Sequence, residues 1–250
     1  MIPVLLLLLQ TAAPADTFRH WRGELGVGAE FHDSDARTTW TAARAALGYR
    51  WARGGVNADL VRTERFDQVD QTVGVEAYLP AGRRTSFYLR AGVTPEAEVV
   101  PEYDLTAEAT RGLGGGWEGT LRYRRMEYST EGVDIISAGV GYYLARWYLR
   151  FNGSLAPREG TAGWNTAFAA RRYLDPRRPE STLDLFADVG REVVTLAPPQ
   201  PPDLRLTSTI GARWQHPVAR RTGLSVSLYR NTEEEAPSRI GTGVGGYLTW

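Results

Sequence analysis

Charged and other polar side chains in this chain alternate with apolar residues along many runs. Around Asp104 and Glu108, for instance, the intervening residues include leucine and alanine. Side chains at alternate positions share one face of a strand, and opposite charges on neighbouring strands stabilise a sheet. The chemistry that this spacing predicts is ion pairing, for example between Asp104 and either Arg122 or Arg124. The charged residues that we assign to this polar face are Glu76, Arg90, Asp104, Glu108, Glu118, Arg122, Arg124, Arg150, Asp184, Asp188, Arg205 and Arg213.

Residues suited to catalysis are few. The chain has no cysteine and no lysine, which excludes thiolate and amine nucleophiles and thiolate metal sites. Its three histidines are His20, His32 and His216. His32 begins the segment HDSD, whose imidazole and carboxylates could activate water, but an ordinary polar turn is the favoured interpretation. We therefore expect no enzyme activity, no catalytic residue, no cofactor and no metal site.

The overall charge is balanced, with 29 basic residues, all of them arginine, and 29 acidic residues. A nucleic-acid-binding protein would carry a basic excess or a basic tract, and the sequence has neither. We therefore expect no nucleic-acid partner.

Residues 1–15 have the pattern of a secretory signal peptide. An apolar run from Ile2 to Leu9 precedes Ala13 and Ala15, which match the small residues of a cleavage site before Asp16. The apolar run is too short for a transmembrane helix, which needs about 20 apolar residues. We predict that residues 1–15 are removed on export and that residues 16–250 form one barrel domain.

The charged positions described above require strands to place them, and the chain from residue 16 onward reads as strands throughout. Apolar and polar residues alternate in successive runs that are separated by clusters of Gly, Pro and charged residues. One hairpin is predicted around the turn at residues 112–116. The runs predict about fourteen antiparallel strands, with twelve as the alternative. Their approximate bounds are 18–31, 38–51, 55–66, 70–79, 84–94, 101–111, 116–128, 133–144, 146–156, 163–174, 181–193, 204–216, 221–231 and 239–250.

An even number of strands of this length is typical of an up-and-down transmembrane β-barrel, although a secreted soluble β-protein would also alternate. Charges in the middle of many strands favour the barrel, because a soluble sandwich would have to bury them without partners. Aromatic residues toward the strand ends favour it too, since Trp and Tyr suit the headgroup level of a membrane. We assign these aromatic residues to the lipid-facing surface: Trp40, Tyr49, Trp51, Trp117, Tyr142, Tyr143, Trp147, Trp164, Tyr173, Trp214, Tyr247 and Trp250.

The connections between the predicted strands alternate in length and charge. If both ends of the mature chain are periplasmic, the odd-numbered connections are extracellular, mostly longer and acidic, as at residues 233–235. The even-numbered connections are mostly tight and carry arginines such as Arg83 and Arg84. This alternation predicts which end of the barrel faces outward.

The last residues resemble an assembly signal. Gly245, Leu248 and Trp250 place a glycine, an apolar residue and a terminal aromatic residue at the spacing of the C-terminal β-signal of outer-membrane barrels. We therefore expect the barrel-assembly machinery and periplasmic chaperones as partners during export, and lipid and lipopolysaccharide as partners in the outer membrane.

Several stretches together resemble the YaiO family of outer-membrane β-barrels. They are RFDQVDQTVGVEAYLP at 65–80, EYDLTAEATRGLGGGWEGTLRYRRMEYS at 102–129, VGYYLARWYLRFN at 140–152 and RRYLD at 171–175. The individual stretches are ordinary barrel strands, and it is their order and spacing that carry the resemblance. The resemblance implies a barrel and an outer-membrane location, and it supplies no substrate.

The first hypothesis for function is a narrow passive channel for small polar or saccharide solutes, because charges that line a lumen can form a polar pore. Two alternatives remain open from the sequence. One is a membrane-embedded hydrolase with its site at the outer rim, and the other is a structural or surface-exposed barrel without transport.

Overall fold

The computed structural model describes residues 20–33, 39–158, 161–194 and 203–250, and these residues form fourteen β-strands in one closed barrel. The predicted antiparallel barrel of fourteen strands is confirmed, and the alternative of twelve is wrong. The predicted signal peptide lies outside the described residues. The strands are β1 (His20–His32), β2 (Trp40–Trp51), β3 (Gly54–Arg65), β4 (Gln68–Ala81), β5 (Thr85–Val93), β6 (Tyr103–Gly114), β7 (Trp117–Glu127), β8 (Gly132–Leu144), β9 (Trp147–Arg158), β10 (Thr161–Asp175), β11 (Arg178–Val194), β12 (Asp203–Pro217), β13 (Thr222–Glu233) and β14 (Ala236–Thr249).

Strand β1 illustrates why the alternating sequence folds in this way. Leu25 and Val27 are 70% and 65% exposed on its outer face, whereas Glu30, on the other face, is 8% exposed. Successive side chains of a strand point to opposite faces, so one face of β1 is apolar and the other is polar. The same arrangement around the barrel covers its outer surface with large apolar side chains, which suits hydrocarbon rather than water.

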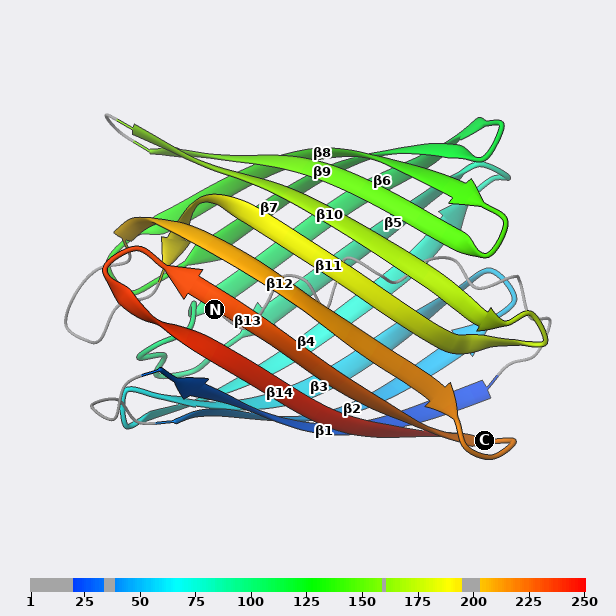
Figure 1. Ribbon diagram of the computed structural model, residues 1–250, viewed down its shortest axis with the longest axis horizontal. Helices are drawn as coiled ribbons and strands as arrows, with labels where there is room; N and C mark the ends of the chain where they lie inside the picture. Colours follow the sequence, from blue (N-terminus) through cyan, green and yellow to red (C-terminus); the bar gives the residue numbers. More distant parts are fainter. Residues whose placement is uncertain (1–19, 34–38, 159–160, 195–202) are drawn as a thin grey trace.

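Each strand pairs with its neighbours in the sequence, and β1 also pairs with β14, beside which it lies in Figure 1. In this pairing Val27 lies opposite Val244. Trp21 and Trp250 exchange two backbone hydrogen bonds, of 2.9 and 3.0 Å, at the end of the junction. A closed sheet has no edge, so the backbone N–H and C=O groups of all strands find partners within the sheet. No helix within the described ranges is long and apolar enough to cross a membrane.

The two ends of the barrel differ in their connections. We call the loop end the one where β1 ends at His32 and β2 begins at Trp40, and the hairpin end the one where β2 ends at Trp51 and β3 begins at Gly54. At the hairpin end, three glycines at positions 114–116 join β6 to β7 with φ angles of 97°, 60° and 86°. These left-handed angles favour glycine, so the predicted turn is confirmed. The side of the membrane on which each end lies stays a prediction.

The aromatic residues divide between the two faces of the sheet. Trp117, Trp164 and Trp250 are exposed on the outer surface, as expected. Trp40 is only 5% exposed and Tyr247 lines the interior. Tyr143 and Tyr173 lie opposite Tyr148 and Thr182, which are 1% and 5% exposed on the inner face. Assigning these four aromatic residues to the lipid-facing surface was wrong. The reason is the register of the strands, because a residue an even number of positions from an inward-facing one also faces inward.

Trp40 belongs to a buried cluster that spans the junction of β1 and β14. The guanidinium carbons of Arg65, on β3, and Arg239, on β14, each lie 4.7 Å from the centroid of its ring. Glu30, on β1, lies 3.3 Å from Arg239 and accepts a hydrogen bond of 2.7 Å from the hydroxyl of Tyr229, on β13. Cation–π contacts and ion pairs therefore join strands on both sides of the junction from within.

We predict that Glu30→Gln lowers the free energy of unfolding by about 3 kcal/mol, because buried Arg65 loses its carboxylate and buried Arg239 keeps only that of Glu233. The control is Glu64→Gln, whose partner Arg62 is 49% exposed, and which should change stability by less than about 1 kcal/mol. Urea unfolding in lipid vesicles, followed by tryptophan fluorescence, measures both variants. Equal effects would show that the cluster does not stabilise the junction.

Candidate functional site

The interior of the barrel contains a cavity of ≈ 530 Å³. Residues from all fourteen strands line it, so this cavity is the lumen of the barrel rather than a pocket on its surface. A volume of this size suits a small molecule. The lumen is therefore the candidate functional site.

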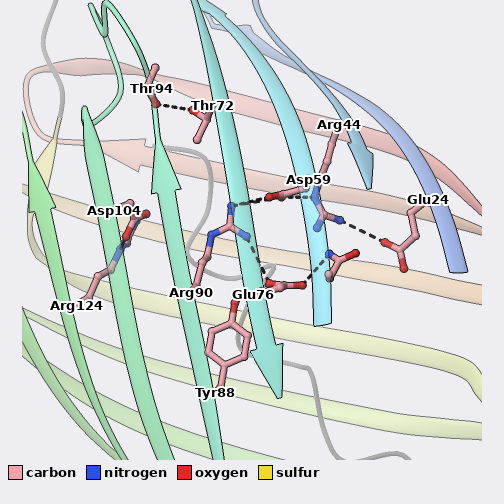
Figure 2. A network of polar contacts seen from close by, with 11 residues as sticks. Glu24, Arg44, Asp59, Thr72, Glu76, Tyr88, Arg90, Thr94, Asp104 and Arg124 are labelled. Atoms are coloured by element: carbon pink, nitrogen blue, oxygen red, sulfur yellow. Dashed lines mark hydrogen bonds and ion pairs between the residues drawn. The ribbon is translucent and has the colours of Figure 1, made fainter. Parts of the chain in front are cut away.

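One wall of the lumen, formed by β2 to β5, carries a network of ion pairs (Figure 2). Asp59 accepts a hydrogen bond of 2.9 Å from Arg44 Nε and lies 3.3 Å from Arg90 Nη2. Arg90 also lies 3.4 Å from Glu76, which accepts a 2.7 Å hydrogen bond from the hydroxyl of Tyr88. Each buried carboxylate thus has several donors around it, which offsets the cost of removing its charge from water.

Further ion pairs lie on β6 to β9. Arg124 donates from Nε and Nη2 to the two carboxylate oxygens of Asp104, at 2.9 and 2.6 Å. The other candidate partner, Arg122, instead donates to Glu108, and Arg150 donates to the same Glu108 oxygen at 3.0 Å. Register explains the choice, because Glu108 lies directly opposite Arg122 and Asp104 reaches Arg124 on a diagonal. We call these ion pairs the arginine ladder. Its members are Arg44, Asp59, Glu76, Arg90, Asp104, Glu108, Arg122, Arg124 and Arg150.

The other predicted charges lie outside the ladder. Glu118 accepts a hydrogen bond from the hydroxyl of Tyr148. Asp184 accepts two hydrogen bonds from Arg171, at 2.6 and 3.1 Å, and lies opposite Arg213 in the pairing of β11 with β12.

The two remaining predicted charges, Asp188 on β11 and Arg205 on β12, lie at different places in the barrel. Asp188 lines the lumen. Arg205 lies near the loop end, where its Nη1 atom is 3.6 Å from Glu233. The structure therefore places seven of the twelve predicted charges in the arginine ladder, where they form three separate groups around Arg90, Arg124 and Glu108.

Several residues of the site were missed from the sequence. Arg44, Asp59 and Glu24 form part of the network, and Glu192 lines the lumen and accepts a hydrogen bond from Asn165. The same alternation of polar and apolar residues marks their strands, so it could have identified them. What the pattern could not supply is which charges meet across strands.

The middle of β13, β14 and β1 carries small side chains on its lumen face, between Glu24 and Tyr247 toward the hairpin end and Glu30 and Tyr229 toward the loop end. Its lumen-lining residues include six small ones: Gly26, Gly28, Ser225, Ser227, Gly243 and Gly245. We call these residues the small-residue wall. Because they are short, the space between this wall and the arginine ladder remains part of the cavity.

One connection at the loop end folds into the lumen. In the segment 94–102, the backbone N–H groups of Glu98, Val99 and Val100 donate to the carboxylate of Asp70 at 2.9, 2.8 and 2.8 Å. Asp70 is 2% exposed and Val99 is 1% exposed, and Val99 and Val100 line the cavity. Hydrogen bonds from N–H groups to an ionised carboxylate are stronger than neutral ones, so this contact fixes the connection against the lumen.

One of the three histidines lies within hydrogen-bond distance of a serine, and that serine is buried. The ring of His32 packs against Trp40 with centroids 4.8 Å apart, while Ser34 and Asp35 lie outside the described residues. His216 Nδ1 lies 2.9 Å from Ser181 Oγ, a pair that the sequence analysis missed. Ser181 is 1% exposed, so its hydroxyl is shielded from any ester in the surrounding lipid. The described residues contain no group of three or more potential metal ligands.

The residues of the predicted assembly signal lie at the end of the last strand. Gly245 faces the lumen, whereas Leu248 and Trp250 are 49% and 52% exposed on the outer surface. The backbone of Trp250 also completes the junction with β1. An assembly role for these residues stays a prediction.

Comparisons with solved structures show the fold that this chain shares. It is similar to CymD, described as a monoaromatic hydrocarbon channel, with 9% identity, a TM-score of 0.63 and coverage of 92% of this chain and 88% of CymD. It is also similar to OpdO of Pseudomonas aeruginosa, with 7% identity, a TM-score of 0.52 and coverage of 93% and 97%. At these identities the similarity concerns the fold alone. The sequence matches no curated protein.

The sequence comparison with protein families is more specific. Residues 22–192 match the YaiO membrane beta barrel domain, which covers more than half of the chain. This match agrees with the strand pattern and with the closed barrel and its apolar outer surface. The chain belongs to the YaiO family of membrane β-barrel proteins and is a protein of the outer membrane.

Proposed function

We propose that this barrel is a narrow passive channel for small polar or saccharide solutes. The observation that carries the proposal is the cavity of ≈ 530 Å³ in the lumen, between the arginine ladder and the small-residue wall. A lumen filled by its own side chains would leave no such space. The ion pairs of the ladder present hydrogen-bonding groups along one side, and the small residues leave room along the other.

In this proposal the solute passes through the barrel without being chemically changed. The ladder residues are engaged with one another, and the buried hydroxyl of Ser181 is inaccessible to substrate. Reconstitution in planar lipid bilayers tests the proposal directly, with stepwise conductance as the expected result. A correctly folded barrel that gives no conductance would favour a structural or surface-exposed role, and turnover of lipid or peptide lost in His32→Ala would favour a hydrolase.

We predict that Gly26→Trp reduces single-channel conductance by about half or more, because the indole enters the lumen. A Cβ at Gly26 would meet only backbone atoms at 3.6 and 3.8 Å, which are ordinary contacts, so the variant should fold. The control is Val27→Trp, which places the same side chain on the outer face, where Val27 is 65% exposed. Unchanged conductance in folded Gly26→Trp would contradict a path along the small-residue wall.

We predict that Arg124→Gln makes the channel more selective for cations, because Asp104 loses its two charged hydrogen bonds and its negative charge then faces the lumen uncompensated. The control is Arg125→Gln, since Arg125 is 37% exposed and pairs with Asp134 and Glu127 outside the lumen. Reversal potentials in a potassium chloride gradient measure the change. A shift of the same size in both variants would place the conducting path away from the ladder.

We predict that Asp70→Ala raises conductance by about twofold or makes it fluctuate, because three backbone N–H groups of the connection 94–102 lose their common acceptor. The control is Glu98→Ala, in the same connection, whose side chain is exposed and whose backbone N–H is retained. Single-channel recording of both variants is the measurement. If both behave as the original protein, the connection does not narrow the path.

A further inference from the structure

Part of the lumen near the loop end is apolar. Five buried apolar residues, with Tyr128 and Ile135 packed against them, form a cluster inside the barrel on β7 to β12. The interior of a transmembrane barrel is ordinarily polar, so an inward-facing apolar cluster needs an explanation. We call this cluster the apolar shelf. Its buried members are Met126, Val133, Ala156, Val193 and Leu204.

Some residues of the shelf pack against each other, and others border the cavity. A Cβ at Gly163 would lie 2.8 Å from Leu204 and 3.3 Å from Ala156, so the missing side chain at Gly163 lets these two residues approach each other. Met126 and Ile135, however, border the cavity together with Ala156. The shelf therefore presents an apolar surface to the lumen as well as filling space.

The connection 94–102 adds apolar surface to the same cavity. Val99, Val100 and Pro101 line it, and Asp70 holds their backbone in place through the hydrogen bonds described above. The connection is therefore a fixed part of the wall. A molecule in the cavity has apolar contacts available from the shelf and from this connection.

Uncharged polar side chains lie next to the shelf on the same strands, toward the hairpin end. Ser137 and Ser154, whose hydroxyls are 2.8 Å apart, occupy the next lumen-facing positions after Ile135 and Ala156. Asn165 holds the corresponding position after Gly163 and also lines the cavity. Hydroxyl and amide groups can bind the hydroxyl groups of a solute at little cost in desolvation.

The charged side chains that border the shelf already have hydrogen-bonding partners: Glu192, next to Val193, accepts a hydrogen bond from Asn165. Arg124, two positions from Met126, donates two hydrogen bonds to Asp104. A charged solute would lose its hydration here and meet side chains that are already hydrogen-bonded to one another. This arrangement favours an uncharged solute.

We propose that the loop end of the lumen holds a binding site for a small uncharged molecule with an apolar ring and several hydroxyl groups, the chemistry of an aryl glycoside. Its ring lies against Ile135, Met126 and Val100, and its hydroxyl groups face Ser137, Ser154 and Asn165. The proposal rests on the proposed channel function, since it names the class of solute that the lumen takes. The site binds such solutes in preference to sugars without an apolar ring and in preference to ions.

The test is equilibrium dialysis of p-nitrophenyl β-D-glucoside against the barrel in lipid nanodiscs, with empty nanodiscs as the blank. We expect saturable binding that an excess of sucrose does not displace. Ile135→Ala should weaken binding about tenfold, since it removes three carbon atoms from the apolar contact. The control is Ile136→Ala, because Ile136 is 51% exposed on the outer face and loses the same atoms. Val100→Ser, in the connection, provides a second variant outside the strands, and it should also weaken binding.

Three outcomes would overturn the proposal: no binding above the empty nanodiscs, displacement by sucrose at the same concentration as by the unlabelled aryl glycoside phenyl β-D-glucoside, or equal affinities of the Ile135→Ala and Ile136→Ala variants. Conductance measured on the same preparation separates this proposal from the channel. Conductance without glucoside binding would leave the channel standing and refute the site. Binding with a silent bilayer would support the site and refute transport.

Discussion

The constraint on which the rest of the structure depends is that hydrocarbon offers no hydrogen-bonding partner to a backbone. The pairing of β1 with β14 satisfies the two strands that would otherwise be edges. Once the sheet is closed, every strand has an outer face toward lipid and an inner face toward the lumen. The alternation of apolar and polar residues, and the enclosed cavity with its charged wall, both follow from this closure.

Closure also favours the pairing of opposite charges on the inner face. Arginines and carboxylates on the inner face are partly or fully removed from water, so an isolated charge would be costly. The ladder from Arg44 to Arg150 meets this requirement with shared partners, as Glu108 does for Arg122 and Arg150. The cluster around Trp40 meets it at the junction by placing Glu30 and an aromatic ring between two arginines.

The lumen is consequently uneven in character. The arginine ladder occupies one side, the small-residue wall leaves space on the other, and the apolar shelf with the connection 94–102 lies toward the loop end. Each of these features needs side chains from several strands, and no single strand shows it. Their combination gives the cavity a polar region and an apolar region, which is the basis for the proposed passage of solutes and for the proposed site.

The sequence alone determined the fold, because alternation with a period of two is a local property that each strand displays independently and because the strand count follows from it. It also identified many of the inward charges and left Arg122 and Arg124 as the two candidate partners of Asp104, between which the register of β6 and β7 decides. It could not place Trp40 or Tyr247, since one residue of register at a strand end moves a side chain to the other face. Three features were decided only by the tertiary structure: the sharing of Glu108 between two arginines, the hydrogen bonds that hold the connection 94–102 to Asp70, and the apolar shelf. Each joins residues that are distant in the sequence and that meet only after the barrel has closed.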